Sequence, residues 1–456
     1  MKTSRQQAGR RATLVACLGL SVALSGCGAV GGVAEATRHR VGLGSGPGPA
    51  ADAPVTAAAA TAPAAALDAQ MEDGTASEII TGLLQRRSVL QPGTLRAVTD
   101  AVLAANSRAA EAELRAATLR AEAAQLNWLP TLGPQISLTS LGDVVTSLVV
   151  DAVLFDHGGK IAERDYARAD VEVAAVALAQ DTNARVLTAL ELYIGAEAAR
   201  ARADVTAAAI ARMERFHYLM NERMSAGIVD RADQQLVAAK LDRMRSELTA
   251  DREAAATAMA ELQAMAAAPV TAVSGLSPVA PPGNQTPLAV LKAEAEAARA
   301  EAEARAARAG QLPGINASGS LSSDGSSGGI TAGGEGIGFG TPARLRALEA
   351  SREASAAEVA AAREDAARKL SQLRGLLASQ ERQAAEAGTI AAQAAESYEL
   401  FAAQLEAGRR RVPEVVGVFE TKVRTEREAV TLRHDVLLTR ARIAETVGTL
   451  VDGERI

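Results

Sequence analysis

The stretch VLFDHGGKIAER, residues 153–164, is compatible with two very different folds. An apolar run meets Gly158 and Gly159, and the residues that follow contain no proline until Pro269. Two glycines between a strand-like run and a helix are typical of a phosphate-binding loop. They also fit a corner at which a membrane strand turns into a long helix. The residues on either side of the stretch distinguish the two interpretations.

The residues before the glycines have the pattern of a β-hairpin. Apolar and polar residues alternate on both sides of Gly142-Asp143, which predicts a hairpin over residues 132–155. Each arm has about ten residues, the length that a tilted strand needs to cross a bilayer. No Lys-Ser or Lys-Thr follows the glycines, so we do not expect nucleotide binding. Gly158 and Gly159 are instead expected to supply the backbone angles of a strand-to-helix corner.

The residues after the glycines predict a helix of about 65 residues, or roughly 100 Å. The segment SAGIVD, residues 225–230, interrupts it, and a second helix runs to about residue 265. A helix is also expected from Pro92 to Leu129, ahead of the first hairpin. The same plan then recurs, with a second hairpin over residues 314–340 and a last helix that reaches about Val451. Leu129-Pro130 reappears as Leu312-Pro313 after 183 residues, and Ala226-Gly227 as Ala407-Gly408 after 181 residues. We therefore expect an internal duplication.

The composition favours long helices. Aromatic residues make up 2% of the 456 residues and charged residues 22%, with both signs interspersed. The net charge of −6 offers no basic surface for nucleic acid. The four histidines are not spaced as metal ligands are, and the sequence shows no recognisable Ser-His-Asp, Cys-His or paired-carboxylate pattern of a catalytic site. We predict no enzyme activity, no cofactor and no metal.

The N-terminus has the pattern of an export signal. Basic residues precede an apolar run from about Ala12 to Leu24, too short for a membrane-spanning helix. The run ends in Leu24-Ser25-Gly26-Cys27, which resembles the lipobox of bacterial lipoproteins. That resemblance implies cleavage before Cys27 and lipidation of Cys27, which would attach the chain firmly to a membrane.

The chain divides by composition into a series of segments. Residues 1–26 are expected to be the lipoprotein signal peptide, residues 27–77 the lipidated Cys and an Ala/Pro/Gly-rich tether, residues 78–268 the first repeat, residues 269–286 a linker and residues 287–453 the second repeat.

The duplicated helix–hairpin–helix plan, with Leu-Pro before the first hairpin and Leu-Phe-Asp-x-Gly-Gly after it, resembles the TolC-like outer-membrane efflux family over residues 78–453. The resemblance implies a mainly α fold with a β-barrel portion. Long coiled-coil helices of a homotrimer would form an α-barrel tunnel, which continues into a 12-stranded trimeric membrane β-barrel. It also implies a passive exit duct in the outer membrane that works with a periplasmic adaptor (membrane fusion) protein and an inner-membrane pump.

The same resemblance implies where the site residues lie. In the family, glycine-containing interruptions between long helices form a periplasmic tip that gates the channel and contacts the adaptor. Gly227 and Gly408 match these interruptions, and Asp233 and Glu414 each follow them by six residues. Arg410 matches the basic tip position. Pro413 departs from the pattern and is expected to bend the second tip.

Two questions stay open at this point. The lipobox favours the efflux branch of the family, whereas the C-terminal residues look as much like members that export polypeptides by type I secretion. The alternative from another functional class is a periplasmic coiled-coil scaffold lipoprotein without a pore.

Overall fold

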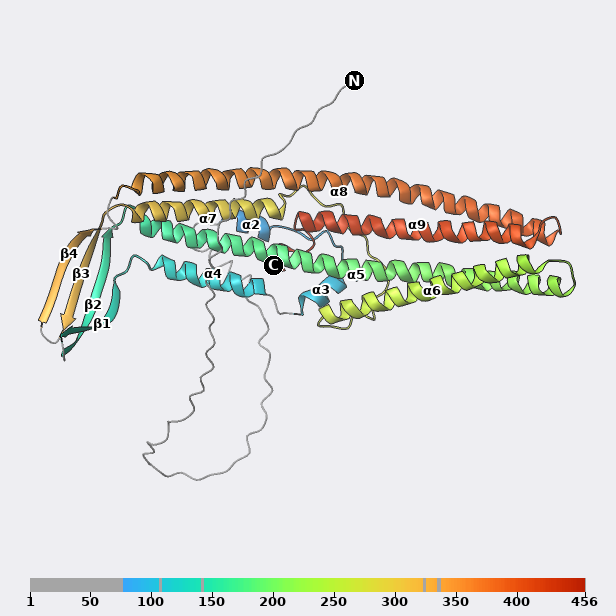
Figure 1. Ribbon diagram of the computed structural model, residues 1–456, viewed down its shortest axis with the longest axis horizontal. Coiled ribbons are helices and arrows are strands. Elements are labelled where there is room, and N and C mark those ends of the chain that lie inside the picture. Colours follow the sequence, from blue (N-terminus) through green and yellow to red (C-terminus); the bar gives the residue numbers. More distant parts are fainter. Residues whose placement is uncertain (1–76, 106–108, 141–142, 323–324, 334–337, 456) are drawn as a thin grey trace, which may run out of the picture. The chain divides into compact units, whose positions relative to one another are not determined.

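The computed structural model describes residues 77–105, 109–140, 143–322, 325–333 and 338–455. Its elements are, in chain order, α2 (Glu78–Leu84), α3 (Thr94–Leu103), α4 (Ala109–Gln125), β1 (Thr131–Ser140), β2 (Asp143–Phe155), α5 (Gly159–Ser225), α6 (Arg231–Met265), α7 (Leu288–Gly310), β3 (Gly314–Ser322), β4 (Gly325–Gly333), α8 (Thr341–Glu406), α9 (Val412–Thr446) and the short 3-10 helix η1 (Gly453–Arg455). Helix, hairpin, long helix and shorter helix follow one another twice (Figure 1). This confirms the duplicated plan predicted from the sequence.

Two helices are much longer than the others. Helix α5 has 67 residues and α8 has 66, so each is roughly 100 Å long at 1.5 Å per residue. Helix α5 packs against α4, α6, α7 and α9, and α8 packs against α7 and α9. Figure 1 shows α6 and α9 beside those halves of α5 and α8 that lie away from the strands. Each repeat is therefore a helical hairpin whose long arm continues toward the sheet.

Small side chains allow these helices to approach one another closely, because the distance between packed helices depends on the side chains at the contact. Helix α5 buries many alanines along its length: Ala162, Ala167, Ala169, Ala175, Ala179, Ala189, Ala196, Ala198, Ala199, Ala203 and Ala209. A long, thin contact of this kind replaces the compact core of an ordinary domain.

The largest apolar cluster lies at mid-length of α5, where α3 and the C-terminal residues pack against it. Leu190, Tyr193 and Ile194 are fully buried there, together with Leu95 of α3 and Leu450. The Tyr193 hydroxyl donates a 2.8 Å hydrogen bond to a main-chain oxygen of the segment between α6 and α7. This cluster holds the two repeats together.

Short main-chain contacts join distant segments around this cluster. Leu90 and Val279 form an antiparallel bridge, and the amide of Val89 donates to the carbonyl of Thr449 at 2.9 Å. The buried Arg86 donates to the carbonyl of Val447, at the end of α9, over 2.5 Å. The start and the end of the described chain are thereby tied to the linker between the repeats.

The strands form one antiparallel sheet in the order β1-β2-β3-β4. Each repeat contributes one hairpin, and β2 pairs with β3 to join the two. Strands β1 and β4 are the two edges of the sheet, and neither has a partner on its outer side in the order of the sheet.

Two elements differ from the sequence prediction. The helix expected from Pro92 onward consists of α3, which ends at Leu103, and α4, which begins at Ala109. The last helix ends at Thr446, five residues before the expected end at Val451, because Gly448 adopts a left-handed φ of 65°. A left-handed glycine after the last turn is a common helix terminator.

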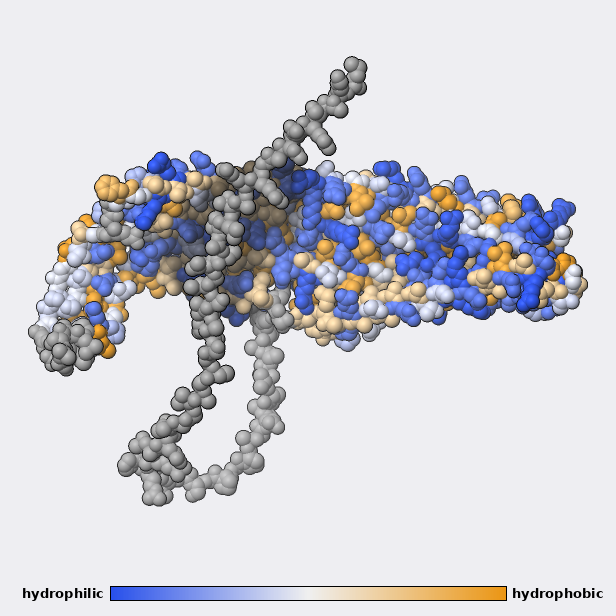
Figure 2. Space-filling model, in the orientation of Figure 1, coloured by the Kyte–Doolittle hydropathy of each residue, from blue (hydrophilic) through white to orange (hydrophobic). Residues whose placement is uncertain are grey.

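Within the described residues, none of the helices combines the length with the apolar composition that a membrane-spanning helix requires. In the space-filling view, hydrophilic residues cover much of the visible helical surface, while the visible part of the sheet is pale to hydrophobic (Figure 2).

Candidate functional site

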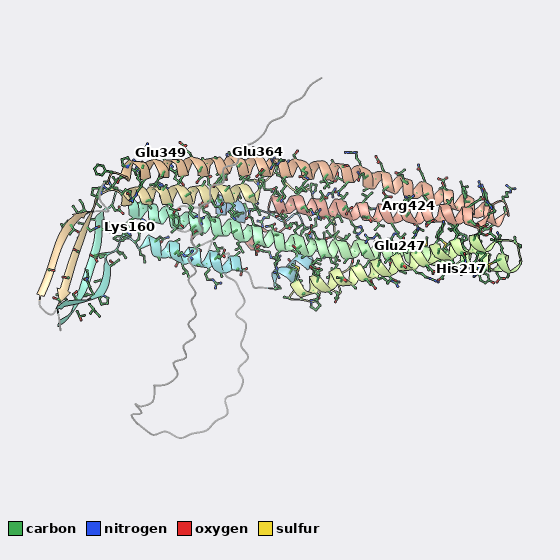
Figure 3. The ribbon with its side chains drawn as sticks, in the orientation of Figure 1. Lys160, His217, Glu247, Glu349, Glu364 and Arg424 are labelled. Atoms are coloured by element: carbon green, nitrogen blue, oxygen red, sulfur yellow. The ribbon has the colours of Figure 1, made fainter. Side chains whose placement is uncertain are left out.

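The turn between α5 and α6 contains Gly227, at the end of the helices away from the sheet. Figure 3 labels Lys160 beside the strands and His217 near this turn, which marks the two ends of α5. Gly227 has a left-handed φ of 72°. Its amide donates to the carbonyl of Met224 (3.0 Å), and the amide of Ile228 donates to Arg223 (2.9 Å). These two bonds form a Schellman motif, which satisfies the last carbonyls of α5.

The turn between α8 and α9 repeats this geometry. Gly408 has a φ of 71°, its amide donates to Leu405 (3.0 Å), and the amide of Arg409 donates to Gln404 (2.8 Å). No heavy atom would lie within 4 Å of a Cβ on Gly227 or Gly408. The two glycines are therefore required by their backbone angle and not by a close neighbour.

The acidic residue after the first turn lies at the start of α6. The carboxylate of Asp230, the N-cap residue, accepts a hydrogen bond from the amide of Asp233 over 2.8 Å. Asp233 is in the first helical turn, where a carboxylate is favoured by the helix dipole. Asp230 was missed by the sequence analysis, although an Asp directly before a predicted helix is a known capping signal.

The structure brings together the two residues predicted at the second turn. Arg410 Nη1 lies 3.3 Å from Glu414 Oε2, and Arg411 Nε lies 3.2 Å from Glu414 Oε1. The guanidinium of Arg410 also lies 4.6 Å from the ring centre of Phe401. Arg411, followed by Arg410, holds the pKa of the exposed Glu414 carboxyl below its ordinary value.

Pro413 does not bend the second turn. It is the second residue of α9, after Arg411 as N-cap. In the first turn of a helix an amide has no intrahelical acceptor, so the missing N–H of proline costs little there. The bend expected from Pro413 is therefore not observed.

An aromatic core behind the turns joins the two helical hairpins. Phe216 of α5 and Tyr398 of α8 both contact Phe419 of α9, with ring centres 5.9 and 4.9 Å apart. Arg212 Nε donates to the Tyr398 hydroxyl over 2.6 Å. Since the three aromatic rings are buried in one cluster, a movement of one turn relative to the other would disturb this core.

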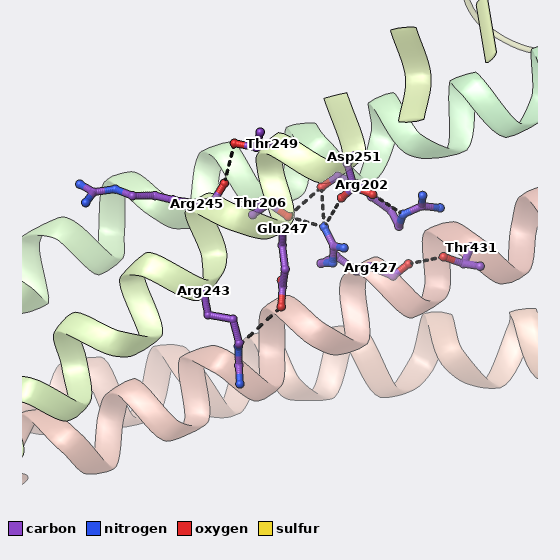
Figure 4. Close-up of polar contacts among 9 residues, drawn as sticks. All are labelled: Arg202, Thr206, Arg243, Arg245, Glu247, Thr249, Asp251, Arg427 and Thr431. Atoms are coloured by element: carbon purple, nitrogen blue, oxygen red, sulfur yellow. Dashed lines mark hydrogen bonds and ion pairs between the residues drawn. The ribbon is translucent and has the colours of Figure 1, made fainter. Parts of the chain in front are cut away.

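A buried polar cluster lies further along the same helices (Figure 4). Asp251 of α6 is 6% exposed. Its carboxylate pairs with Arg202 Nε of α5 at 3.0 Å and with Arg427 Nη1 of α9 at 2.6 Å. Arg427 also donates to the hydroxyl of Thr206. This cluster connects three helices, and no pattern in the sequence had indicated it.

The strand-to-helix corner is organised by Asp156. Its carboxylate accepts from the amides of Gly158 (3.1 Å) and Lys160 (2.5 Å), which caps the first turn of α5. Gly158 has a φ of 85°, and a Cβ on Gly159 would lie 2.9 Å from the Asp156 carboxylate. The backbone angle predicted for both glycines is found at Gly158 alone, whereas Gly159 is the first residue of α5 and is required by the lack of space beside Asp156.

The sheet presents two chemically different faces. Directly paired residues on neighbouring strands lie on the same face of a sheet, so the register defines each face. One face is mainly apolar and carries Leu132, Pro134, Ile136, Leu148, Val150, Ala152, Ala317, Leu321 and Ile330, with Thr146 and Ser326 as its polar members. The other is mainly polar and carries Thr131, Gln135, Ser147, Asp151, Asn316, Ser318, Ser320, Ser327 and Thr331, with Val149 and Val153 as its apolar members.

Comparison by sequence and by structure gives different results. No family model matches the sequence, and no curated protein matches it. Several solved structures match the fold. A membrane protein from Pseudomonas aeruginosa aligns with a TM-score of 0.70 and 18% identity, over 80% of this chain and 92% of that one. The outer membrane protein VceC of Vibrio cholerae aligns with a TM-score of 0.66 and 16% identity, over 78% and 97%. The CmeC outer membrane channel of Campylobacter jejuni aligns with a TM-score of 0.66 and 9% identity, over 78% and 86%.

VceC and CmeC are TolC-family outer membrane channels. This chain has the TolC-like fold. The resemblance inferred from the hairpins and the glycine corners is thereby confirmed as a likeness of fold. Within the TolC-like fold, Gly227, Gly408 and Arg410 lie in the turns between the helices, and Asp233 and Glu414 lie in the first turns of α6 and α9 that follow.

Two other predictions concern lipidation and metal binding. Cys27 lies outside the described residues. In the part of the chain that the structure describes, no three His, Cys, Asp or Glu side chains form a group that could hold a metal ion.

Proposed function

We propose that the protein is an outer-membrane exit duct in which three copies of the chain form one channel. The channel exports small molecules or polypeptides passively, as one component of a tripartite efflux or type I secretion system. Its helices extend into the periplasm, and lipidated Cys27 adds an anchor to the outer membrane.

One observation carries this proposal: the four-stranded sheet is amphipathic and has two open edges. An apolar sheet face suits lipid, but open edges do not occur in the hydrocarbon region, because their amide and carbonyl groups would have no partner. Edge strands β1 and β4 have similar lengths of 10 and 9 residues. Pairing β4 of one copy with β1 of the next closes a threefold ring of twelve strands, with no edge left.

The helices support the same assembly. Helix α8 has only seven buried residues in its 66 within a single chain. Glu349 and Glu364, labelled in Figure 3, belong to its exposed surface. Neighbouring copies would cover part of this surface and complete a tunnel that continues the barrel.

The turns at Gly227 and Gly408 are the proposed entrance and adaptor-docking site. Asp233 and Glu414 would form rings of carboxylates around a threefold axis, as charged side chains do at channel constrictions. The pairing of Arg410 with Glu414 gives each subunit a basic group that can exchange between this partner and an acidic group of the adaptor protein.

The identity of the pump decides between the two export classes. A resistance-type pump and a fusion protein encoded next to this gene would favour efflux, whereas an ABC transporter beside a large repeat protein would favour type I secretion. The division of the chain into signal, tether and two repeats joined by residues 269–286 is part of the same proposal.

The alternative is a periplasmic scaffold lipoprotein without a pore. One observation favours it: Ile330 is the only large apolar residue of β4, a strand otherwise made of Gly, Ser, Thr and Ala. Planar-bilayer recordings of the purified protein distinguish the two. The exit duct predicts steady conductance and a heat-modifiable trimer on gels, whereas a protein with neither property would be a scaffold.

A further inference from the structure

Among the side chains that the structure describes on the polar face of the sheet, one is charged. Asp151 of β2 pairs in register with Thr131 of β1 and with Ser318 of β3. Among the strand residues whose side chains the structure describes, Asp151 alone is charged, and the others on its face carry hydroxyl, amide or no polar groups. Asp151 is therefore the one charge among the described side chains of this face.

The carboxylate of Asp151 is available to a solute. Its side chain is exposed, and no ion pair joins it to a cationic side chain among the described residues. The Thr131 hydroxyl contacts the main-chain oxygen of Asp151 at 3.4 Å, not its carboxylate. The Asp151 side chain therefore acts neither as a capping group nor as an ion-pair partner of the described residues.

The register fixes the direction in which Asp151 faces. The next residue, Ala152, pairs with Ala317 on the apolar face, and successive strand residues point to opposite sides. In a barrel whose apolar face meets lipid, Asp151 faces the lumen, because it lies on the opposite face of the sheet and a carboxylate facing lipid is destabilising.

We propose that Asp151 is a specificity-determining residue of the channel, and that three copies form a ring of carboxylates in the barrel which favours cationic solutes. The inference rests on the proposed trimeric duct. The ring of Asp151 carboxylates would be a second ring of charged side chains in the channel. It would lie at the opposite end of the long helices from the turns at Gly227 and Gly408.

The size of the effect follows from the barrel geometry. Twelve strands about 4.8 Å apart and tilted by about 40° give a barrel radius of about 12 Å. The carboxylates reach about 4 Å inward, so they lie about 8 Å from the axis, within the screening length of about 10 Å at 0.1 M salt. Three unit charges at this distance in water favour a monovalent cation over an anion at the axis by about tenfold. At 1 M salt, where the screening length is about 3 Å, the preference falls to about 1.4-fold.

The test measures the cation-to-anion permeability ratio of the full-length trimer in planar bilayers with a KCl gradient around 0.1 M. Asp151→Asn should lower the ratio several-fold, and in 1 M KCl the difference should shrink to about 1.4-fold. The matched control moves the charge across one strand pair: Asp151→Ser combined with Ser318→Asp should restore the ratio, because residues 151 and 318 are opposite one another.

A second readout locates the side chain directly. A cysteine at position 151 should react with a charged, membrane-impermeant thiol reagent and change the conductance, whereas Ala152→Cys on the apolar face should not. An unchanged ratio in Asp151→Asn, or reaction of Ala152→Cys in place of Asp151→Cys, would overturn the inference while leaving the duct intact. Absence of conductance in the unmodified protein would instead overturn the duct, and the inference with it.

Discussion

The buried carboxylate of Asp251 in α6 leads to a quantitative prediction about stability. Asp251 is 6% exposed and pairs with Arg202 and Arg427 from two other helices. Replacing Asp251 by Ala leaves two partly buried guanidinium groups close together without a counter-charge. Removing one partner of a buried ion pair typically costs 3–5 kcal/mol. Because the two arginines retain some exposure, we expect a loss at the lower limit, about 3 kcal/mol.

Thermal unfolding of the purified protein, followed by far-ultraviolet circular dichroism, measures this loss. With an unfolding entropy of about 2.1 cal/mol/K per residue over about 370 residues, 3 kcal/mol lowers the melting temperature by about 4 °C. The matched control is Asp242→Asn on the same helix, which removes an exposed pair with Arg245. Surface pairs contribute about 0–1 kcal/mol, so the control should shift the melting temperature by no more than about 1 °C.

The reasoning also predicts partial rescue. Replacing all three charged residues by apolar ones of similar size (Arg202→Met, Asp251→Leu and Arg427→Met) should recover much of the loss, because no unpaired charge then stays buried. A melting temperature of Asp251→Ala equal to that of Asp242→Asn would refute the argument, since it would mean that burial adds nothing to this pair.

Three further predictions concern single positions. Gly448→Ala should cost about 3 kcal/mol, because the left-handed φ is combined with a Cβ only 2.5 Å from Arg86 Nη1. Gly227→Ala, with a similar φ and free space, should cost about 1 kcal/mol; equal melting temperatures of the two variants would contradict this. The Glu414 pair with its arginines contributes fully above the ordinary Glu pKa of 4.5 and is lost as pH falls through the lowered pKa of the folded state. Arg411→Gln should therefore raise the pKa of Glu414 in a carbon-13 NMR titration, and an unchanged titration curve would count against the pairing. Asp156→Ala should cost about 1 kcal/mol through the lost cap, with faster hydrogen exchange in the first turn of α5 as its signature; protection equal to that of the unmodified protein would show that the cap is dispensable.

The regular parts of the fold could be predicted from the sequence because their signals are local. Alternation around Gly142-Asp143 marks the first hairpin, and the long proline-free runs mark α5 and α8. The glycines at 227 and 408 indicate the turns because a left-handed residue is needed where each helix ends. Each of these signals can be recognised within one continuous segment of the chain, without knowledge of its tertiary contacts.

The connections between the repeats could not be predicted in this way. Arg86 contacts Val447 across 361 residues, and Asp251 contacts Arg427 across 176. A single Arg or Asp within a charged helix has no local feature that distinguishes a buried partner from a solvated one. Helix α2 was missed because its seven residues are too few for a periodic pattern, and such a helix depends on tertiary packing.

The central claim is that each chain supplies one third of a closed membrane wall. The most direct test uses the mature protein with Cys27 replaced by Ser, exported by a conventional signal peptide so that no lipid anchor is present. The account predicts that this protein stays in the outer-membrane fraction through an alkaline wash and is extracted by detergent as a trimer. Release from the membrane as a monomer would contradict it.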